Sequence, residues 1–298
     1  MKNKTLYIAE LQLLSVAIVW GGGFVATEYC LEAGMPTSLI LSIRFSLAAL
    51  VMSLFSINVL KSIDKKTLFH GIVAGLLLLV AFFVQVVGQN ATTVSNSAFL
   101  TATNVVMVPF IVWIFTKHKP TTKFFILPLV TFVGVAILTL KPSQSFSFNK
   151  GDLLVLICAV LYAVHIAYLG VVAKDLDAKI LTLLQLATCG VVATIIFFVF
   201  DFSTTPTAAY VDGFLPAIYL ALFSTCFCYF FQTKAQQIVP PSKVGIILCT
   251  EGLFGTICSV ILGIEPFKVS ILVGGLIIIS SVMLSEVDFS FLKKKSKF

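Results

Sequence analysis

Charged residues are scarce in this chain. Asp, Glu, Lys and Arg form 11% of its 298 residues, and hydrophobic residues form 59%, whereas soluble domains carry roughly 25% charged residues. Residues 67–116 contain none of the four charged types. A membrane-spanning helix needs about 17–25 mostly apolar residues, so this run of 50 residues is long enough for two spans. The shortage of charge excludes a water-soluble fold.

Apolar runs without charge recur along the chain. They cover residues 11–27, 124–140, 153–173, 180–200, 213–233 and 269–285, and two further runs, 37–60 and 244–264, carry one charge each, Arg44 and Glu251. Lipid leaves only helices or closed barrels as spanning structures, and barrel strands show an alternating polarity that these continuous runs lack. The sequence therefore predicts an all-α membrane protein with ten transmembrane helices and short connectors.

Clusters of reactive side chains are also missing. The histidines His70, His118 and His165 lie in separate segments, and the chain has no GxxxxGK[ST] loop for ATP. Its seven cysteines lack zinc-ligand spacing, and Cys226 and Cys228 would point to nearly opposite faces of a helix, which favours buried structural thiols. We predict no catalytic residues, no metal site and no cofactor.

The lysines indicate the orientation, because short cytoplasmic loops are enriched in Lys and Arg. With a cytoplasmic amino terminus, sixteen lysines fall in cytoplasmic segments and three, Lys141, Lys150 and Lys268, fall in outer ones. This bias requires an even number of spans and predicts that both termini are cytoplasmic. An anionic inner leaflet explains the net charge of +7, so no nucleic-acid partner is expected.

The two halves of the chain resemble each other. Residues 82–138 and 226–284 share the same order of spans and connectors, and Gln85 corresponds to Tyr229 at an offset of 144 positions. The connector near Asn90 is uncharged, whereas its counterpart carries Lys234 and Lys243. Because each half has five spans, the second half enters the membrane from the opposite side. We predict two inverted five-helix repeats, an architecture of secondary transporters.

Four short motifs carry a family resemblance. They are residues 20–25 (WGGGFV), 42–49 (SIRFSLAA), 106–109 (VMVP) and 263–266 (GIEP). Together with the inverted halves, they resemble EamA-like transporters of the drug/metabolite transporter (DMT) superfamily over about residues 8–286. The resemblance implies ten helices and export of small metabolites or amphiphilic solutes by alternating access. The family usually places Pro after the glutamate of span 9, whereas Gly252 follows Glu251 here.

This organisation predicts three parts. The first EamA-like five-helix repeat covers residues 5–141, the second covers 150–288, and a basic cytoplasmic tail covers 289–298. We expect an integral multi-pass protein of the inner, or plasma, membrane. Gly71 and Gly75 form a GxxxG motif that permits close helix contact, and we expect this contact to lie within the chain. The sequence leaves a monomer and a dimer both open.

Two charged side chains fall inside spans, where charge is costly and tends to face the interior of the bundle or a cavity. Glu251 fits either a protonatable coupling group or a structural carboxylate hydrogen-bonded between helices. Arg44 could attract a substrate carboxylate, but we favour helix packing or a bond to a neighbouring carbonyl, because facing backbone can satisfy the many donors of Arg.

Neutral polar and aromatic side chains recur at helical spacing in several spans. The candidates for the wall of a central cavity are Trp20 in span 1, Gln85 and Gln89 in span 3, Ser97, Thr101 and Asn104 in span 4, Tyr162 and His165 in span 6, and Thr225, Tyr229 and Gln232 in span 8. Hydrogen bonding between helices is the alternative role for each of them. His165 is the second candidate for proton coupling, because an unperturbed histidine titrates near physiological pH.

These features predict a secondary transporter that exports small metabolites, amino acids or amphiphilic drugs. Its expected partners are a small-molecule solute, the lipid bilayer and, if transport is coupled, protons. The alternatives are a membrane-embedded enzyme, which would need a reactive cluster, and a receptor or scaffold, which would not need inverted halves. The sequence does not identify the solute.

Overall fold

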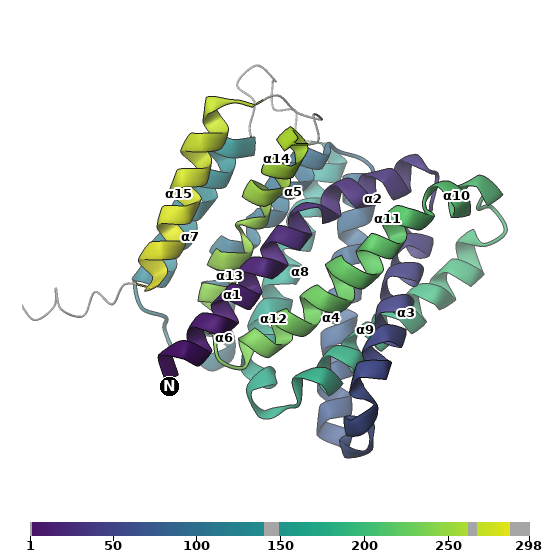
Figure 1. The fold of residues 1–298 in the computed structure, drawn as a ribbon, viewed down its shortest axis with the longest axis horizontal. Helices are drawn as coiled ribbons and strands as arrows, with labels where there is room; N and C mark the ends of the chain where they lie inside the picture. Colours follow the sequence, from purple (N-terminus) through teal and green to yellow (C-terminus); the bar gives the residue numbers. More distant parts are fainter. Residues whose placement is uncertain (1, 140–148, 262–266, 287–298) are drawn as a thin grey trace, which may run out of the picture.

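The computed structural model describes residues 2–139, 149–261 and 267–286, and these form a bundle of helices (Figure 1). Seven helical stretches are long and apolar enough to cross a membrane, judged by length and composition. They are Lys4–Glu32, Thr37–Ser62, Lys65–Gln89, Asn96–Thr116, Lys150–Asp175, Ala178–Asp201 and Phe214–Gln236. The basic tail and the motif at 263–266 lie outside the described residues.

The helices of the first half form spans 1 to 5. In chain order they are α1 (Lys2–Gly21) and α2 (Gly23–Glu32) in span 1, α3 (Thr37–Ser56) in span 2, α4 (Lys65–Gln89) in span 3, α5 (Val94–Ala102) and α6 (Asn104–Thr116) in span 4, and α7 (Lys123–Thr139) in span 5.

The helices of the second half form spans 6 to 10. They are α8 (Lys150–Val172) in span 6, α9 (Ala178–Ile196) in span 7, α11 (Phe214–Tyr219) and α12 (Cys228–Gln236) in span 8, α13 (Pro241–Leu248) and α14 (Glu251–Ile261) in span 9, and α15 (Val269–Glu286) in span 10. The short α10 (Thr207–Asp212) lies before span 8. The protein is thus an all-α membrane protein with about ten spans.

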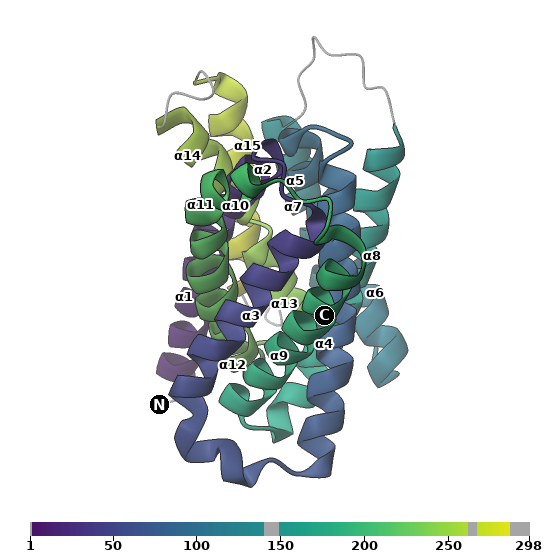
Figure 2. The same cartoon turned by 90° about the vertical axis from the view of Figure 1, so that its right-hand side faces the viewer.

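The packing of the spans repeats between the halves. Span 3 of the first half packs on span 6 of the second, and the equivalent pair, spans 8 and 1, is also in contact. Likewise span 4 packs on span 6, and the equivalent pair, spans 9 and 1, is in contact. Spans 2 and 7 pack on each other, and so do spans 5 and 10, whose helices α7 and α15 lie side by side at one edge of the bundle (Figures 1 and 2). For these pairs, each span of the first half thus makes the same contacts as its equivalent in the second half, which lies five spans later. This is the pattern expected of a structural repeat.

Side-chain caps start several spans at the ends of the bundle. The Asp64 carboxylate accepts a hydrogen bond from the Thr67 amide at the start of α4, and Asp177 accepts from two amides at the start of α9. Asn149 and Asp152 form a reciprocal capping box at the start of α8. These caps satisfy amide groups that the first helical turn leaves without a partner.

The bundle is apolar outside and partly polar inside. Large apolar side chains are exposed on the outer faces of the spans, where lipid would contact them, among them Phe198, Phe200, Leu215, Ile261 and Met283. The buried polar side chains include five glutamines, Gln85, Gln89, Gln185, Gln232 and Gln236. Four of these five glutamines donate to another span, and Gln232 donates to Gln236 of its own helix.

Lys243 differs from the position that the lysine count gave it. It lies in the first turn of α13, is buried, and forms an ion pair with Glu10 of α1. Lys243 therefore links spans 1 and 9 inside the bundle instead of standing in an exposed connector.

Glycines allow close contact between spans at several crossings. A Cβ atom added to Gly75 of α4 would lie 2.7 Å from the carbonyl oxygen of Gln185 in α9, and one added to Gly71 would lie 2.4 Å from the Leu184 Cβ. The GxxxG motif therefore packs within the chain, as the sequence predicted, and not between two copies.

We predict that Gly75→Ala destabilises the protein by about 1–3 kcal/mol, because the added methyl group overlaps backbone that cannot move aside. The measurement is thermal unfolding of the purified protein in detergent. Gly245→Ala is the matched control, since its Cβ would have no atom nearer than 3.5 Å and alanine favours a helix. Equal losses of stability in the two variants would contradict this account of the crossing.

Candidate functional site

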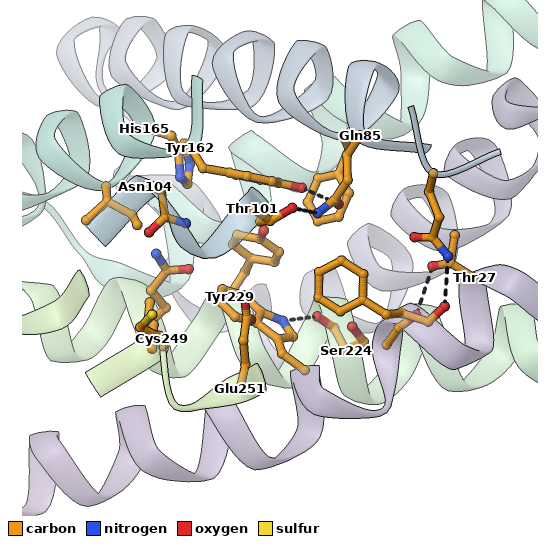
Figure 3. Close-up of a pocket in the computed structure, with 18 of the residues that line it drawn as sticks. Thr27, Gln85, Thr101, Asn104, Tyr162, His165, Ser224, Tyr229, Cys249 and Glu251 are labelled. Atoms are coloured by element: carbon orange, nitrogen blue, oxygen red, sulfur yellow. Dashed lines mark hydrogen bonds between the residues drawn. The ribbon is translucent and has the colours of Figure 1, made fainter. Parts of the chain in front are cut away.

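A cavity lies between the two halves of the bundle (Figure 3). The space that no atom fills is about 680 Å³, including the part that opens to solvent. Its wall is built by side chains from spans 1, 2, 3, 4, 6, 8 and 9. In the part of the chain that the structure describes, spans 5, 7 and 10 contribute none of the lining residues.

The structure brings the sequence-derived candidates together on this wall. The eleven lining residues among them are Trp20, Arg44, Gln85, Gln89, Thr101, Asn104, Tyr162, His165, Tyr229, Gln232 and Glu251. Their nearness to one another is a result of the fold, while their part in binding or transport stays a prediction.

Two broken helices place polar residues at the cavity. Span 4 breaks at Thr103, whose hydroxyl and amide both donate to the Leu100 carbonyl, at 2.7 and 3.1 Å. Span 9 breaks in the same way at Thr250, whose hydroxyl and amide donate to the Ile247 carbonyl at the same two distances.

The residue after each break begins the next helix and lines the cavity. It is Asn104 in span 4 and Glu251 in span 9. The two residues thus occupy equivalent positions in the two repeats. The amino end of a helix favours negative charge, which suits the Glu251 carboxylate.

Hydrogen bonds connect the cavity wall across spans 3, 4 and 6. The Tyr162 hydroxyl donates to Gln85 Oε1 at 2.8 Å, and Gln85 Nε2 donates to Thr101 Oγ1 at 3.2 Å (Figure 3). These bonds hold the Gln85 side chain between Thr101 and Tyr162. They leave the aromatic face of Tyr162 on the cavity wall.

Aromatic rings form another part of the wall. Trp20 Nε1 donates to the Ser224 carbonyl at 2.7 Å, which joins span 1 to span 8. The Trp20 and Tyr229 ring centroids are 5.4 Å apart, and Phe82 lies 5.3 Å from Tyr162 and 6.1 Å from Tyr229. The cavity therefore combines neutral hydrogen-bonding groups with aromatic faces.

Arg44 is held by span 8 and by an aromatic ring. Its Nε donates to Thr225 Oγ1 at 2.5 Å and its Nη2 donates to Ser224 Oγ at 3.1 Å. The guanidinium carbon lies 4.2 Å from the centroid of the Phe82 ring, a cation–π distance. Its partners are hydroxyl groups and a ring, not the backbone carbonyl that a structural role had suggested.

Glu251 differs from the other charged groups of the interior. Among the residues that the structure describes, its carboxylate has no hydrogen-bond or ion-pair partner. It shares the cavity with one buried cation, Arg44, and with His165, whose Nε2 lies 3.1 Å from Gln185 Oε1. Glu251 is therefore accessible from the cavity to a solute or a proton.

Polar contacts cross the bundle at both ends of the cavity. Toward the amino-terminal end of α1, the Glu10–Lys243 ion pair joins span 1 to span 9. Toward the other end, Gln89 Nε2 donates to Glu28 Oε2 and to the Phe24 carbonyl, both at 3.0 Å, which joins span 3 to α2.

The sequence analysis missed several lining residues. Phe24 and Thr27 line the cavity with Trp20, and their spacing of four and seven positions after Trp20 was a usable signal for one helix face. Ser224 and Phe82 also line it, but no polar pattern marked them.

Two expected residues do not line the cavity. Span 8 contains a π-helical segment, Leu220–Phe227, and Thr225 is turned to Arg44 while Ser224 lies on the wall. Ser97 of α5 is buried and does not line the cavity, although Thr101 of the same helix does.

Comparison with known proteins agrees with this geometry. Residues 7–140 and 149–286 match the EamA-like transporter family. The chain belongs to this family of membrane transporters. It is 30% identical over 257 residues to an uncharacterized transporter of Archaeoglobus fulgidus, an alignment that covers 86% of this chain and 78% of the archaeal protein.

Two further relatives cover almost the whole EamA-like chain. An uncharacterized inner membrane transporter, YicL, of Salmonella typhimurium is 23% identical over 297 residues, which cover 93% of this chain and 95% of that protein. A crystal structure of a protein superposes with a TM-score of 0.78 at 14% identity and covers 98% of this chain and 99% of the other. The latter similarity supports the fold.

We predict that Arg44→Met and Thr225→Val destabilise the protein non-additively, because both remove the same buried hydrogen bond. A coupling free energy of about 1–3 kcal/mol is expected from a double-mutant cycle measured by thermal unfolding. Thr131→Val supplies the control, since Thr131 bonds to Ser281 between spans 5 and 10 and should combine additively with Arg44→Met. Additive effects of the first pair would show that this bond does not contribute to stability.

Proposed function

We propose that this EamA-like transporter exports small organic solutes, of the size of amino acids or amphiphilic drugs, across the inner membrane by alternating access. The observation that carries the proposal is the cavity, whose wall draws on both repeats. It offers aromatic faces, neutral hydrogen-bonding groups, and one group of each charge, Arg44 and Glu251. Export, as opposed to uptake, rests on the resemblance of the sequence motifs to those of exporters.

The contacts at the two ends of the cavity support alternating access. Glu10–Lys243 and Gln89–Glu28 each connect a helix of span 1 to another span, at opposite ends of the cavity. A solute can leave toward one side only when the contact on that side separates. Alternating access requires that one of these contacts separates while the other stays intact, so that the cavity opens to one side of the membrane at a time.

Substrate flux in proteoliposomes tests the function, and a screen identifies the solutes to use. Cells that overproduce the protein are exposed to a panel of amino acids and amphiphilic drugs, and the solutes to which they become resistant are assayed in proteoliposomes. Flux that exceeds that of protein-free vesicles supports the proposal. Binding of such solutes without flux would favour a receptor.

Proton coupling through Glu251 gives a sharper prediction. Glu251→Gln keeps the shape and the hydrogen-bonding capacity of the side chain but removes its titration, so any dependence of flux on a proton gradient should be abolished. The measurement is pH-driven flux in proteoliposomes of the well-folded variant. Glu32→Gln is the matched control, because Glu32 is exposed at the end of α2 and does not line the cavity, so this variant should keep the dependence.

The outcome of this test also separates the alternatives. If Glu251→Gln retains the full dependence on the gradient, Glu251 is a structural carboxylate and His165 becomes the coupling candidate. If the wild-type protein itself shows flux without any dependence on the gradient, the protein is a uniporter.

The orientation with both termini in the cytoplasm is tested by cysteine labelling. Lys65 and Thr204 are exposed residues that this topology places inside and outside, respectively. In a background without the seven native cysteines, an impermeant maleimide should label Thr204→Cys in intact cells and Lys65→Cys only after permeabilisation. The reversed pattern would show that both termini lie outside. The end of the cavity assigned to the cytoplasm would then face the outside.

A further inference from the structure

One buried polar atom of the cavity wall has no hydrogen-bond partner among the residues that the structure describes. Gln232 of α12 lines the cavity and is 1% exposed. Its Oε1 atom is buried and has no hydrogen-bond partner among the described residues. Leaving a buried acceptor unsatisfied costs about 1–3 kcal/mol. A ligand that donates a hydrogen bond to this oxygen would recover that free energy.

The orientation of the Gln232 amide follows from a chain of hydrogen bonds that ends at the backbone. The Ile166 carbonyl can only accept, and Gln236 Nε2 donates to it at 2.7 Å. Gln236 must therefore turn its Oε1 toward Gln232, whose Nε2 donates to it at 3.2 Å. This leaves Gln232 Oε1, and not its amino group, without a partner. The usual ambiguity between the two amide atoms is thus resolved by Ile166.

The surroundings of this oxygen favour a positively charged donor. Tyr229 precedes Gln232 by one helical turn, and its ring centroid lies 5.4 Å from that of Trp20 and 6.1 Å from that of His165. Aromatic faces attract cations, and the partner-free carboxylate of Glu251 stands on the same wall. An ammonium group that carries at least one N–H matches all three features: the acceptor oxygen of Gln232, the aromatic rings and the carboxylate of Glu251.

We propose that Gln232 determines specificity by accepting a hydrogen bond from an N–H of the solute's ammonium group, with Gln236 as the residue that positions its amide. This assignment rests on the proposed function and deepens it, because it names the chemical group that the cavity recognises. It also distinguishes primary and secondary amines from quaternary ones, which carry the same charge without a donor.

The test compares two probes of equal charge, phenethylamine and N,N,N-trimethylphenethylammonium. Their affinities for the purified full-length protein in detergent are measured by calorimetry, which does not depend on transport. We expect the wild-type protein to prefer the primary amine. Gln232→Met should lower this preference about tenfold or more, as expected for the loss of one charge-assisted hydrogen bond.

Two further variants separate recognition from stability. Gln236→Met releases the Gln232 amide to rotate, so the preference for the primary amine should fall although Gln232 is intact. Gln237→Met is the matched control, because Gln237 donates to the Leu176 carbonyl and does not line the cavity; its preference should equal that of the wild type. Thermal unfolding of each variant shows that the comparison is made between folded proteins.

The outcomes are distinct from those of the transport assay. Failure of phenethylamine to bind the wild-type protein, or an unchanged preference in Gln232→Met, overturns the role of Gln232. Preferential binding that Gln232→Met abolishes, without flux of phenethylamine in proteoliposomes, supports the role of Gln232 and counts against the proposed transport.

Discussion

Every part of this structure depends on the need of backbone polar groups for partners inside the membrane, where water is absent. Spans 4 and 9 break their helices, and each break is satisfied by a threonine, Thr103 or Thr250, that donates from both its hydroxyl and its amide to the carbonyl three residues earlier. Such breaks are tolerated where protein or a cavity surrounds them. The cavity and the irregular backbone therefore occupy the same place, and Asn104 and Glu251 reach the cavity because they follow the breaks.

The same constraint applies to charge, and it separates Glu251 from the other charged groups of the interior. Arg44 is bonded to two hydroxyls, Lys243 is paired with Glu10, and Asp152 is bonded by Thr92 and by the Asn149 backbone amide. Each of these contacts joins two spans or caps the start of one. The charged groups that make them therefore have structural roles. Glu251 faces the cavity without such a partner in the described part of the chain. A carboxylate in that position is open to a hydrogen-bond donor or a cation that enters the cavity.

The sequence predicted the spans, the two halves and most of the cavity wall for a common reason: a polar side chain such as Gln85 or Tyr229 is conspicuous in an apolar run and must face the interior. Features that depend on irregular backbone were not predictable. A π-helical segment changes the helical phase of span 8, so Ser224 and not Thr225 lines the cavity. The orientation of the Gln232 amide depends on the Ile166 carbonyl of another span, which no local pattern encodes.

The two repeats share a frame but not their chemistry. At equivalent breaks the first repeat carries the neutral Asn104 and the second carries Glu251, and at equivalent places in spans 3 and 8 they carry Gln85 and Tyr229. In an inverted-repeat transporter, the two halves exchange conformations when the protein changes from inward-open to outward-open. If the two halves carried identical side chains, these two states would be equal in energy. A ligand shifts such an equilibrium only by interacting differently with the two states. Under the proposed mechanism the asymmetry would supply that difference, because a solute or proton bound at Glu251 would act on one half alone.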